Sequence, residues 1–357
     1  MKVSYLLPLS LLLTAPTQAA QLSLGGFLKT NIKVADGTLP FKEIYDGIMP
    51  PGEDTRKTQF SAQESRLNLS LTQGQAKGFI EIDFAGSAQG NSIVSNSYSP
   101  RLRHAYISYE GLTVGQTWST MVNTSTFPES ANLGGPLVGE AMVRQAQVRY
   151  SFDDNNWQIA LENPTTYGKY VITDAQGDTS IKDYSKADDY IPDLVIRRNI
   201  SGDWGNVSAA ALVRALKPAD SYQAAIGGSV AGKFNLWGKD DLRIQLHYGN
   251  LGRYVGTGAA LDIYNGELET ILGGTVAYRH FWNDNLRSSI FYGQSTTEIE
   301  NNNRRQYALN LFGNLTRELV VGVEVGRYDV DDGVTTGRPK DMKGSSNYLQ
   351  LSMQFFI

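Results

Sequence analysis

The sequence predicts an all-β protein: a transmembrane, antiparallel, up-and-down β-barrel of about 16 strands, with one loop folded into the pore. Three observations lead to this prediction. Apolar and polar residues alternate with a period of two along most of the chain. The connections between the alternating segments are short and long in turn. So many strands would also enclose a space too wide for apolar side chains to fill.

The composition excludes several other classes of protein. Of the 357 residues, 41% are hydrophobic and 10% are aromatic, which is too apolar for a disordered chain. No run of about 20 apolar residues follows position 20, so spanning helices are not expected. The net charge of -4 does not favour a nucleic-acid partner. The absence of cysteine removes disulfides, Cys-zinc sites and thiol nucleophiles.

Residues 1–20 have the layout of a cleaved secretory signal peptide. Met1 and Lys2 form a short basic start, and a leucine-rich run covers 6–13. Small residues then precede an expected cleavage after Ala19 or Ala20. The alternative is a buried N-terminal strand or helix. We therefore expect one mature domain at 21–357, exported as in a bacterial envelope protein.

The first segment of this domain shows the strand pattern clearly. Leu22, Leu24 and Leu28 fall on one face, whereas Lys29 and Lys33 fall on the other. The same pattern predicts strands at 21–35, 59–72, 75–85, 101–109, 112–119, 143–152, 157–162, 193–200, 204–216, 223–236, 241–250, 273–282, 286–295, 305–314, 318–330 and 345–357.

The connections differ in length at the two ends of these strands. Tight turns of Asn, Asp, Gly and Ser, such as 73–74, 110–111 and 283–285, alternate with long polar connections. This sorting is typical of a membrane barrel, whereas a soluble β-sandwich would need Greek-key crossings. The long connections are 36–58, 86–100, 120–142, 163–192, 251–272, 296–304 and 331–344.

The size of the barrel decides which face points outward. Strands about 4.8 Å apart and tilted by about 40° would close into a wall of roughly 100 Å, with a radius of about 16 Å. The apolar face must then contact lipid while the polar face lines water. Aromatic residues near strand ends fit interfacial girdles, with ordinary core aromatics as the alternative. They are Trp118, Tyr150, Trp157, Trp204, Phe234, Trp237, Tyr248, Tyr278 and Trp282.

Two stretches resemble bacterial outer-membrane porins of the trimeric class. The alternation over 349–357 resembles the C-terminal signal read by the barrel-assembly machinery, although that signal usually ends in Phe and this chain ends in Ile357. The stretch 100–150 resembles the third-loop region of such porins, and is closest to the DcaP-like porin family. This resemblance implies uptake of dicarboxylates and related small anions. Its motifs are residues 101–106, 115–120, 127–129, 134–136 and 144–150.

Strand parity places a row of arginines on the inward face. Fixed guanidinium groups on a water-filled wall would attract anions, and weak repeated binding suits conduction. The alternative is that they are solvated lumen residues neutralised by partners, as Arg243 would be by Asp241. The candidate pore-lining residues are Arg66, Arg101, Arg103, Arg149, Arg197, Arg214, Arg243, Arg279 and Arg287.

Residues 120–142 are the candidate constriction loop. Gly134 and Gly135 permit backbone bends in a confined space. Pro128 precedes Glu129, whose carboxylate we expect to face the arginines and set a transverse field across the pore. The alternative is an external loop packed on the rim.

Four polar residues fall on the predicted outward face: His104, Tyr106, Ser108 and Gln116. Polar groups are unfavourable against lipid, so burial against a neighbouring subunit would satisfy them. This predicts a homotrimer with the fourth and fifth strands near the contact. A one-residue β-bulge that reverses the parity is the competing interpretation.

These features predict an outer-membrane diffusion channel that prefers small anions such as dicarboxylates and is not an enzyme. A nonselective porin and a plugged structural or adhesin barrel are the alternatives. A hydrolase would need a nucleophile beside His104, His247 or His280, and no such motif occurs. Neither a metal nor another cofactor is expected. The expected partners are small anionic solutes, the bilayer with its lipopolysaccharide, the barrel-assembly machinery and two further copies of the chain, without nucleic acid.

Overall fold

The computed structural model describes residues 19–38, 55–86, 98–132, 138–185, 189–255, 260–335 and 342–357. Most of the expected signal peptide lies outside the described residues, as do Gly134 and Gly135 of the candidate constriction loop. The described chain is almost entirely β-structure, with short 3-10 turns at η2 (Thr124–Thr126) and η4 (Gly252–Tyr254). None of the described helices is long and apolar enough to cross a membrane.

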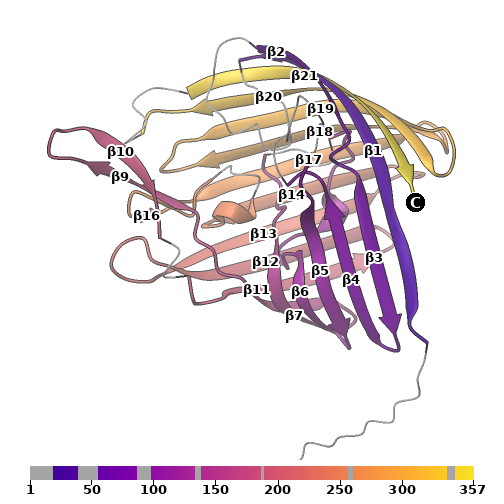
Figure 1. Ribbon diagram of the computed structural model, residues 1–357, viewed down its shortest axis with the longest axis horizontal. Helices are drawn as coiled ribbons and strands as arrows, with labels where there is room; N and C mark the ends of the chain where they lie inside the picture. The colour runs from indigo at the N-terminus through magenta and orange to yellow at the C-terminus, as the bar shows by residue number, and fades with distance from the viewer. Residues whose placement is uncertain are drawn as a thin grey trace, which may run out of the picture.

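The main sheet closes on itself as an antiparallel barrel (Figure 1). It contains 17 strands, but β2 and β3 lie end to end beside β1, so together they occupy one position and the wall has 16 strand positions. β21 pairs with both β20 and β1, which joins the last strand to the first. This closure pairs the two ends of the described wall with each other, and it confirms the expected fold class. The barrel strands are β1 (Gln21–Gly37), β2 (Thr55–Ser61), β3 (Arg66–Gln73), β4 (Ala76–Asp83), β5 (Arg101–Tyr109), β6 (Leu112–Trp118), β7 (Arg144–Phe152), β8 (Trp157–Glu162), β11 (Asp193–Gly202), β12 (Gly205–Leu216), β13 (Gln223–Asn235), β14 (Asp241–Gly249), β17 (Ile271–Phe281), β18 (Leu286–Thr297), β19 (Asn303–Asn314), β20 (Leu319–Asp332) and β21 (Met342–Phe356).

The second expected strand, 59–72, is interrupted between β2 and β3. There the chain turns into the lumen, where Glu64 and Ser65 are buried. Lys29 Nζ donates to Glu64 Oε2 at 2.6 Å, and the Lys29 amide donates to Ser65 Oγ at 3.0 Å. These contacts with β1 accompany the end of the regular ladder, and the sequence agrees, because 63–66 are all polar and break the alternation.

Two of the expected long connections contain strands of their own. β9 (Gly168–Thr173) and β10 (Thr179–Asp183) form a hairpin, and β15 (Ile263–Tyr264) and β16 (Glu267–Leu268) form a shorter one. β9 pairs in parallel with β15, so both connections join in a second sheet of four strands. The β9–β10 hairpin projects from one end of the barrel (Figure 1). No strands are expected here from the alternation, because β10 is exposed throughout and shows no buried face.

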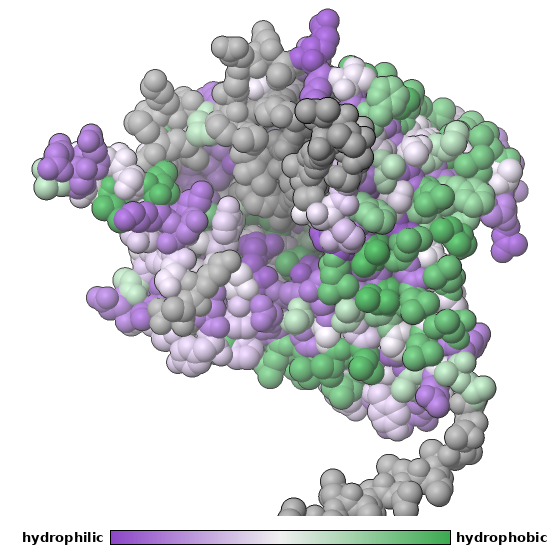
Figure 2. All heavy atoms as spheres, in the orientation of Figure 1, coloured by the Kyte–Doolittle hydropathy of each residue, from purple (hydrophilic) through white to green (hydrophobic). Residues whose placement is uncertain are grey.

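The two faces of the barrel wall have the expected opposite character. On β19 the side chains of Tyr307, Leu309 and Leu311 are exposed on the outside. Gln306 and Asn310, which alternate with them, are buried toward the lumen. Figure 2 shows apolar residues gathered over the part of the wall that faces the viewer on the right. An outward apolar belt around polar inner side chains is the arrangement of a barrel that stands in lipid.

A β-bulge between β4 and β5 changes the side-chain parity of β5. Glu81 pairs with His104, but the next residue, Ile82, pairs with Leu102. Arg103 is therefore the extra residue of the bulge, and both Arg103 and His104 point into the lumen. The ladder to β6 then continues with the opposite parity from the one that simple alternation predicts.

The bulge corrects the expected orientation of β5. His104, Tyr106 and Ser108 face the lumen, so the prediction that they point outward is wrong. Gln116 keeps its outward parity, but its Nε2 donates to the carbonyl oxygen of Leu102 at 2.9 Å, at the bulge. The side-chain amide therefore satisfies a backbone group that the bulge leaves unpaired. None of the four residues needs a neighbouring subunit to satisfy it.

Candidate functional site

All nine arginines of the predicted inner row lie on the inward parity of their strands, but their partners differ. The guanidinium groups of Arg66, Arg149 and Arg197 form no ion pair with a carboxylate among the described residues. The other six form ion pairs, as the alternative of a neutralised lumen would require. These six are Arg101, Arg103, Arg214, Arg243, Arg279 and Arg287.

On one side of the lumen, two arginines of β5 hold two carboxylates of β4. Arg101 binds Asp83 through two hydrogen bonds, from Nε at 2.9 Å and from Nη2 at 2.6 Å. Arg103 donates from Nε to Glu81 at 2.7 Å and from Nη1 to Asp83 at 2.9 Å. Arg101 and Arg103 are two residues apart and share the inward face, and the bulge adds His104 to that face.

Two further arginines next to this group have no carboxylate partner among the described residues. The guanidinium of Arg66 lies 5.3 Å from the ring centre of Phe27, and its buried Nε has no hydrogen-bond partner. Arg144 lies 4.3 Å from the ring centre of Trp118 and interacts electrostatically with Arg103. Strand parity predicted an outward Arg144, so sequence reasoning missed it. We define the cationic cluster as Arg66, Arg101, Arg103 and Arg144.

The positive surface extends along the inner face of β7 and β11. Arg149 on β7 has a buried Nε without a hydrogen-bond partner. Arg197 on β11 donates to Asn199 Oδ1 at 2.6 Å and to the carbonyl oxygen of Val122 at 2.5 Å. Arg149 and Arg197 also interact electrostatically with each other. Neither charge is neutralised by a described carboxylate ion pair, so both act on the contents of the lumen.

The arginines of β14, β17 and β18 are paired instead. Asp241 accepts from Arg243 at 2.6 Å and from Arg279 at 2.5 Å. Glu129 of the candidate constriction loop accepts from Arg287 Nε at 2.8 Å and from Arg279 Nη1 at 3.3 Å. The carboxylate of Glu129 therefore meets arginines on the wall beside the loop. It ties the loop to β17 and β18, and the transverse field expected from Glu129 stays a prediction.

The described first part of that loop, 120–132, lies inside the barrel. Near its start, Asn123 donates to side chains of β12. Pro128 is buried farther along. At the end of this stretch the amide of Ala131 donates to Glu324 at 2.8 Å, and its carbonyl accepts from Lys29 Nζ at 2.6 Å. The loop thus follows the inner wall from β12 to the seam between β20 and β1.

A second connection, 251–272, packs against this loop. Leu251, Tyr254 and Val255 are fully buried in an apolar cluster with Met121. Val255 also forms an isolated β-bridge with Ala141 of the candidate constriction loop. The signal in the sequence was weak: a few apolar residues in a connection rich in glycine.

Arg214 anchors this second connection to the wall. Its guanidinium binds Asp193 of β11 at 3.1 Å and also binds Asp262, and the side chain is only 1% exposed. The Tyr254 hydroxyl donates to Asp193 at 2.8 Å. Burial, together with the neighbouring carboxylates, raises the pKa of Tyr254 well above its usual value, so its hydroxyl remains a donor. Arg214 therefore holds the structure together and does not line water.

The three histidines do not form a common site. His104 on β5 and His247 on β14 face the lumen, whereas His280 on β17 faces outward and accepts or donates through Nδ1 to Asp240 at 2.7 Å. The described residues contain no group of three or more metal-ligating side chains that could hold an ion.

Comparisons with known proteins agree with this architecture. Residues 52–195 match the model of the DcaP outer membrane protein family. The chain is similar to the crystal structure of the outer membrane channel DcaP of Acinetobacter baumannii, with a TM-score of 0.76 and 23% identity over 95% of this chain and 97% of that one. No curated protein matches the chain.

More distant similarity reaches other porin structures. OmpT of Vibrio cholerae aligns with a TM-score of 0.57 and 12% identity, over 96% of this chain and 99% of that one. OmpF of Salmonella typhi aligns with a TM-score of 0.55 and 12% identity, over 94% of this chain and 97% of that one. The closed barrel, its polar lumen and these matches identify the chain as an outer-membrane β-barrel of the porin fold, and its residues 52–195 are similar to the DcaP outer membrane protein family.

Proposed function

We propose that the chain is an outer-membrane diffusion channel that passes small hydrophilic solutes and prefers anions such as dicarboxylates. One observation carries the proposal: four guanidinium groups on β3, β7 and β11 form no carboxylate ion pair among the described residues. They are Arg66, Arg144, Arg149 and Arg197.

The charge balance of the cationic cluster supports anion preference. Among the described residues, its four guanidinium groups form ion pairs with two carboxylates, those of Glu81 and Asp83. On the opposite wall, Asp241 and Glu129 are matched by arginines, so they present little free negative charge. Solutes would pass between the loop and the cationic cluster, and an anion there exchanges water for guanidinium donors. Repeated weak sites favour passage over retention.

Ion selectivity tests the proposal directly. In a KCl gradient across a planar bilayer, we expect a reversal potential of the sign that reports chloride as the more permeant ion. One charge about 7 Å from the ion path in water contributes roughly 0.6 kcal/mol, or about a threefold change in ion partition. Arg66→Ala and Arg149→Ala should each lower the chloride preference by about this factor.

The control for this experiment is Arg198→Ala. Arg198 lies on the outward face of β11 and pairs with Asp153, so its loss should leave the reversal potential unchanged. Cation preference of the unmodified protein would refute the anion channel and leave a general porin. The two connections inside the lumen also favour a plugged barrel as a second candidate, and absence of conductance would support it.

Solute class is tested with the same variants in liposomes. Uptake of succinate-like diacids should exceed that of neutral sugars of equal size, and Arg66→Ala should reduce this ratio. Replacing Arg101 or Arg103 should reduce it further, because each replacement also removes one of the two arginines that bind the carboxylate of Asp83. Equal uptake of both solute types would leave a nonselective channel.

We also propose that the channel is a homotrimer inserted by the barrel-assembly machinery. The support for a trimer is the resemblance to trimeric porins, one of which, OmpT of Vibrio cholerae, is described in a trimer form and aligns with a TM-score of 0.54 at 13% identity. The alternating C-terminal residues 349–357 support the second part of the proposal.

A further inference from the structure

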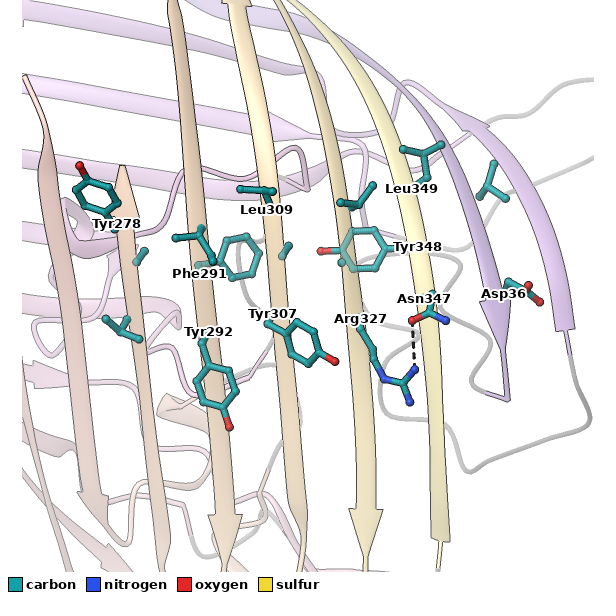
Figure 3. A pocket seen from close by; sticks show the side chains of 17 residues that line it. Asp36, Tyr278, Phe291, Tyr292, Tyr307, Leu309, Arg327, Asn347, Tyr348 and Leu349 are labelled. Carbon is teal, nitrogen blue, oxygen red and sulfur yellow. Dashed lines mark hydrogen bonds between the residues drawn. The ribbon is translucent and has the colours of Figure 1, made fainter. Parts of the chain in front are cut away.

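A groove of about 1030 Å³ crosses the outer wall from β17 to β21 and reaches β1 (Figure 3). Its sides are two rows of outward side chains that follow paired positions from strand to strand. Aliphatic residues and tyrosine rings line most of it. Figure 3 shows Tyr292, Tyr307, Arg327, Asn347 and Asp36 in sequence across the strands, at one side of the groove.

The groove lies where the apolar belt of the wall ends. On β20 the outward residues are apolar as far as Val325 and charged from Arg327 onward. On β21 the same change occurs between Leu349 and Asn347. The charged ends of these strands lead into a long connection, which in such barrels is the external side. The groove therefore lies at the level where acyl chains of the outer leaflet meet their headgroups.

Two cations stand at the polar side of the groove. Arg327 donates to Asp329 at 2.8 Å and to Ser345 at 2.8 Å, and 37% of its side chain remains exposed. Arg305 is paired in register with Asp329 on the neighbouring strand, which places it diagonally opposite Arg327. The Nε of Arg305 is buried without a hydrogen-bond partner, and its guanidinium forms no ion pair among the described residues.

Neighbouring charges do not supply the missing anion. Asp331 is bound by Lys343 at 3.1 Å, and Asp36 is bound by Arg56 at 3.0 Å. Asp329 is held by Arg327. A guanidinium in a lipid-facing wall that lacks an anion is unfavourable until a phosphate or carboxylate reaches it.

We propose that this groove binds a phosphorylated glycolipid of the outer leaflet, the lipid A part of lipopolysaccharide. One acyl chain lies between the two rows, and a phosphate bridges Arg305 and Arg327. Because the bilayer is itself apolar, packing of the acyl chain adds little preference for one lipid over another. The guanidinium–phosphate contacts determine which lipid is retained. The site faces away from the lumen and is independent of solute selectivity.

Lipid binding to the purified full chain tests this site. The protein in detergent is titrated with bis-phosphorylated lipid A, and bound lipids are counted by native mass spectrometry. We expect one retained lipid per chain, and a loss of affinity on the order of tenfold in the Arg305→Ala, Arg327→Ala double variant. Arg198→Ala removes an outward arginine at the other end of the wall and should bind like the unmodified protein.

Two further arms make the result decisive. Leu309→Trp should also weaken binding, because it fills the groove without touching a charge. Fully dephosphorylated lipid A and phosphatidylglycerol should bind more weakly than bis-phosphorylated lipid A. Equal retention by the double variant, or of these two lipids, would overturn the proposal. The heat-dependent shift of a folded barrel on gels verifies folding of every variant, and either folded variant suffices for the test.

A second copy of the chain is the other occupant that the test must detect. The chain contains no cysteine, so Leu309→Cys introduces a single thiol inside the groove. If the groove holds lipid, no disulfide forms between copies in isolated outer membranes under oxidation. A cross-linked pair would show that the groove is a contact between subunits and would refute the lipid site.

Discussion

Arg214 and Arg149 both point inward, yet their surroundings give them different roles. Arg214 is 1% exposed and lies between Asp193 of β11 and Asp262 of the connection after β14. Its two ion pairs therefore hold that connection against the wall. Arg149 forms no ion pair among the described residues, so its charge acts on the lumen. Alternation assigns both to one face because it reports parity alone. The partner Asp262 is 48 residues away from Arg214 in sequence and lies outside any strand.

Glu140 predicts a pH dependence at the residue scale. Burial raises its pKa well above the usual value, and a hydrogen bond from Gln245 offsets this only in part. Its folded-state pKa is therefore above its unfolded value. Docking of the loop is fully stable below the unfolded pKa, and this stability falls as pH rises from there toward the folded pKa, by at most about 1.4 kcal/mol per pH unit.

We therefore expect single-channel conductance to rise and become noisier as pH is raised, because the end of the candidate constriction loop leaves its site. Glu140→Gln should remove this pH dependence, whereas Glu110→Gln, in an exposed turn, should keep it. The measurement is conductance in planar bilayers over a pH series. An identical pH profile for Glu140→Gln and the unmodified protein would contradict the role assigned to this carboxyl group.

At the scale of elements, the β5 bulge and the candidate constriction loop together decide which side chains line the open part of the lumen. The bulge in β5 brings Arg103 and His104 to the same side. The loop covers the inner face of β12 to β20 and leaves the cationic cluster on the remaining wall. A strand without the bulge would direct His104 and Tyr106 to lipid, as alternation predicts. Local insertion of one residue thus decides the polarity of half a strand.

Glu324 provides a test of the loop's position. Its carboxylate accepts hydrogen bonds from Ser130 Oγ at 3.0 Å and from the Ala131 amide at 2.8 Å. Glu324→Ala should release this part of the loop from the wall and raise single-channel conductance. Glu318→Ala, at an exposed turn beside the same strand, is the matched control and should have no effect. Unchanged conductance in Glu324→Ala would mean that the loop does not limit the pore.

At the scale of the whole molecule, closure ties the two ends of the chain together. β1 pairs with β21 over most of its length and with β2 and β3 on its other side. Closure lets the backbone groups of the first and last strands pair within the wall, which lipid requires. Closure satisfies the backbone within one chain, so assembly into a trimer must be tested separately.

The proposed trimer predicts a specific behaviour on gels. Detergent extracts that are not heated should show a band of about three times the monomer mass, which disappears to monomer on boiling. A monomer band under all conditions, in the presence of chemical cross-linker as well, would refute the trimer. The corrected orientation of His104, Tyr106 and Ser108 means that replacing these residues should not dissociate it.

Sequence by itself determined the approximate number of barrel strands, their approximate bounds, the outward apolar face and the inward arginines. These follow from alternation and turn residues, which are properties of neighbouring positions. Tertiary structure alone decided which arginines are neutralised, where the β5 bulge lies, and that the connection after β14 packs beside the candidate constriction loop. Those features depend on side chains that approach one another from distant parts of the chain, where a local pattern carries no information.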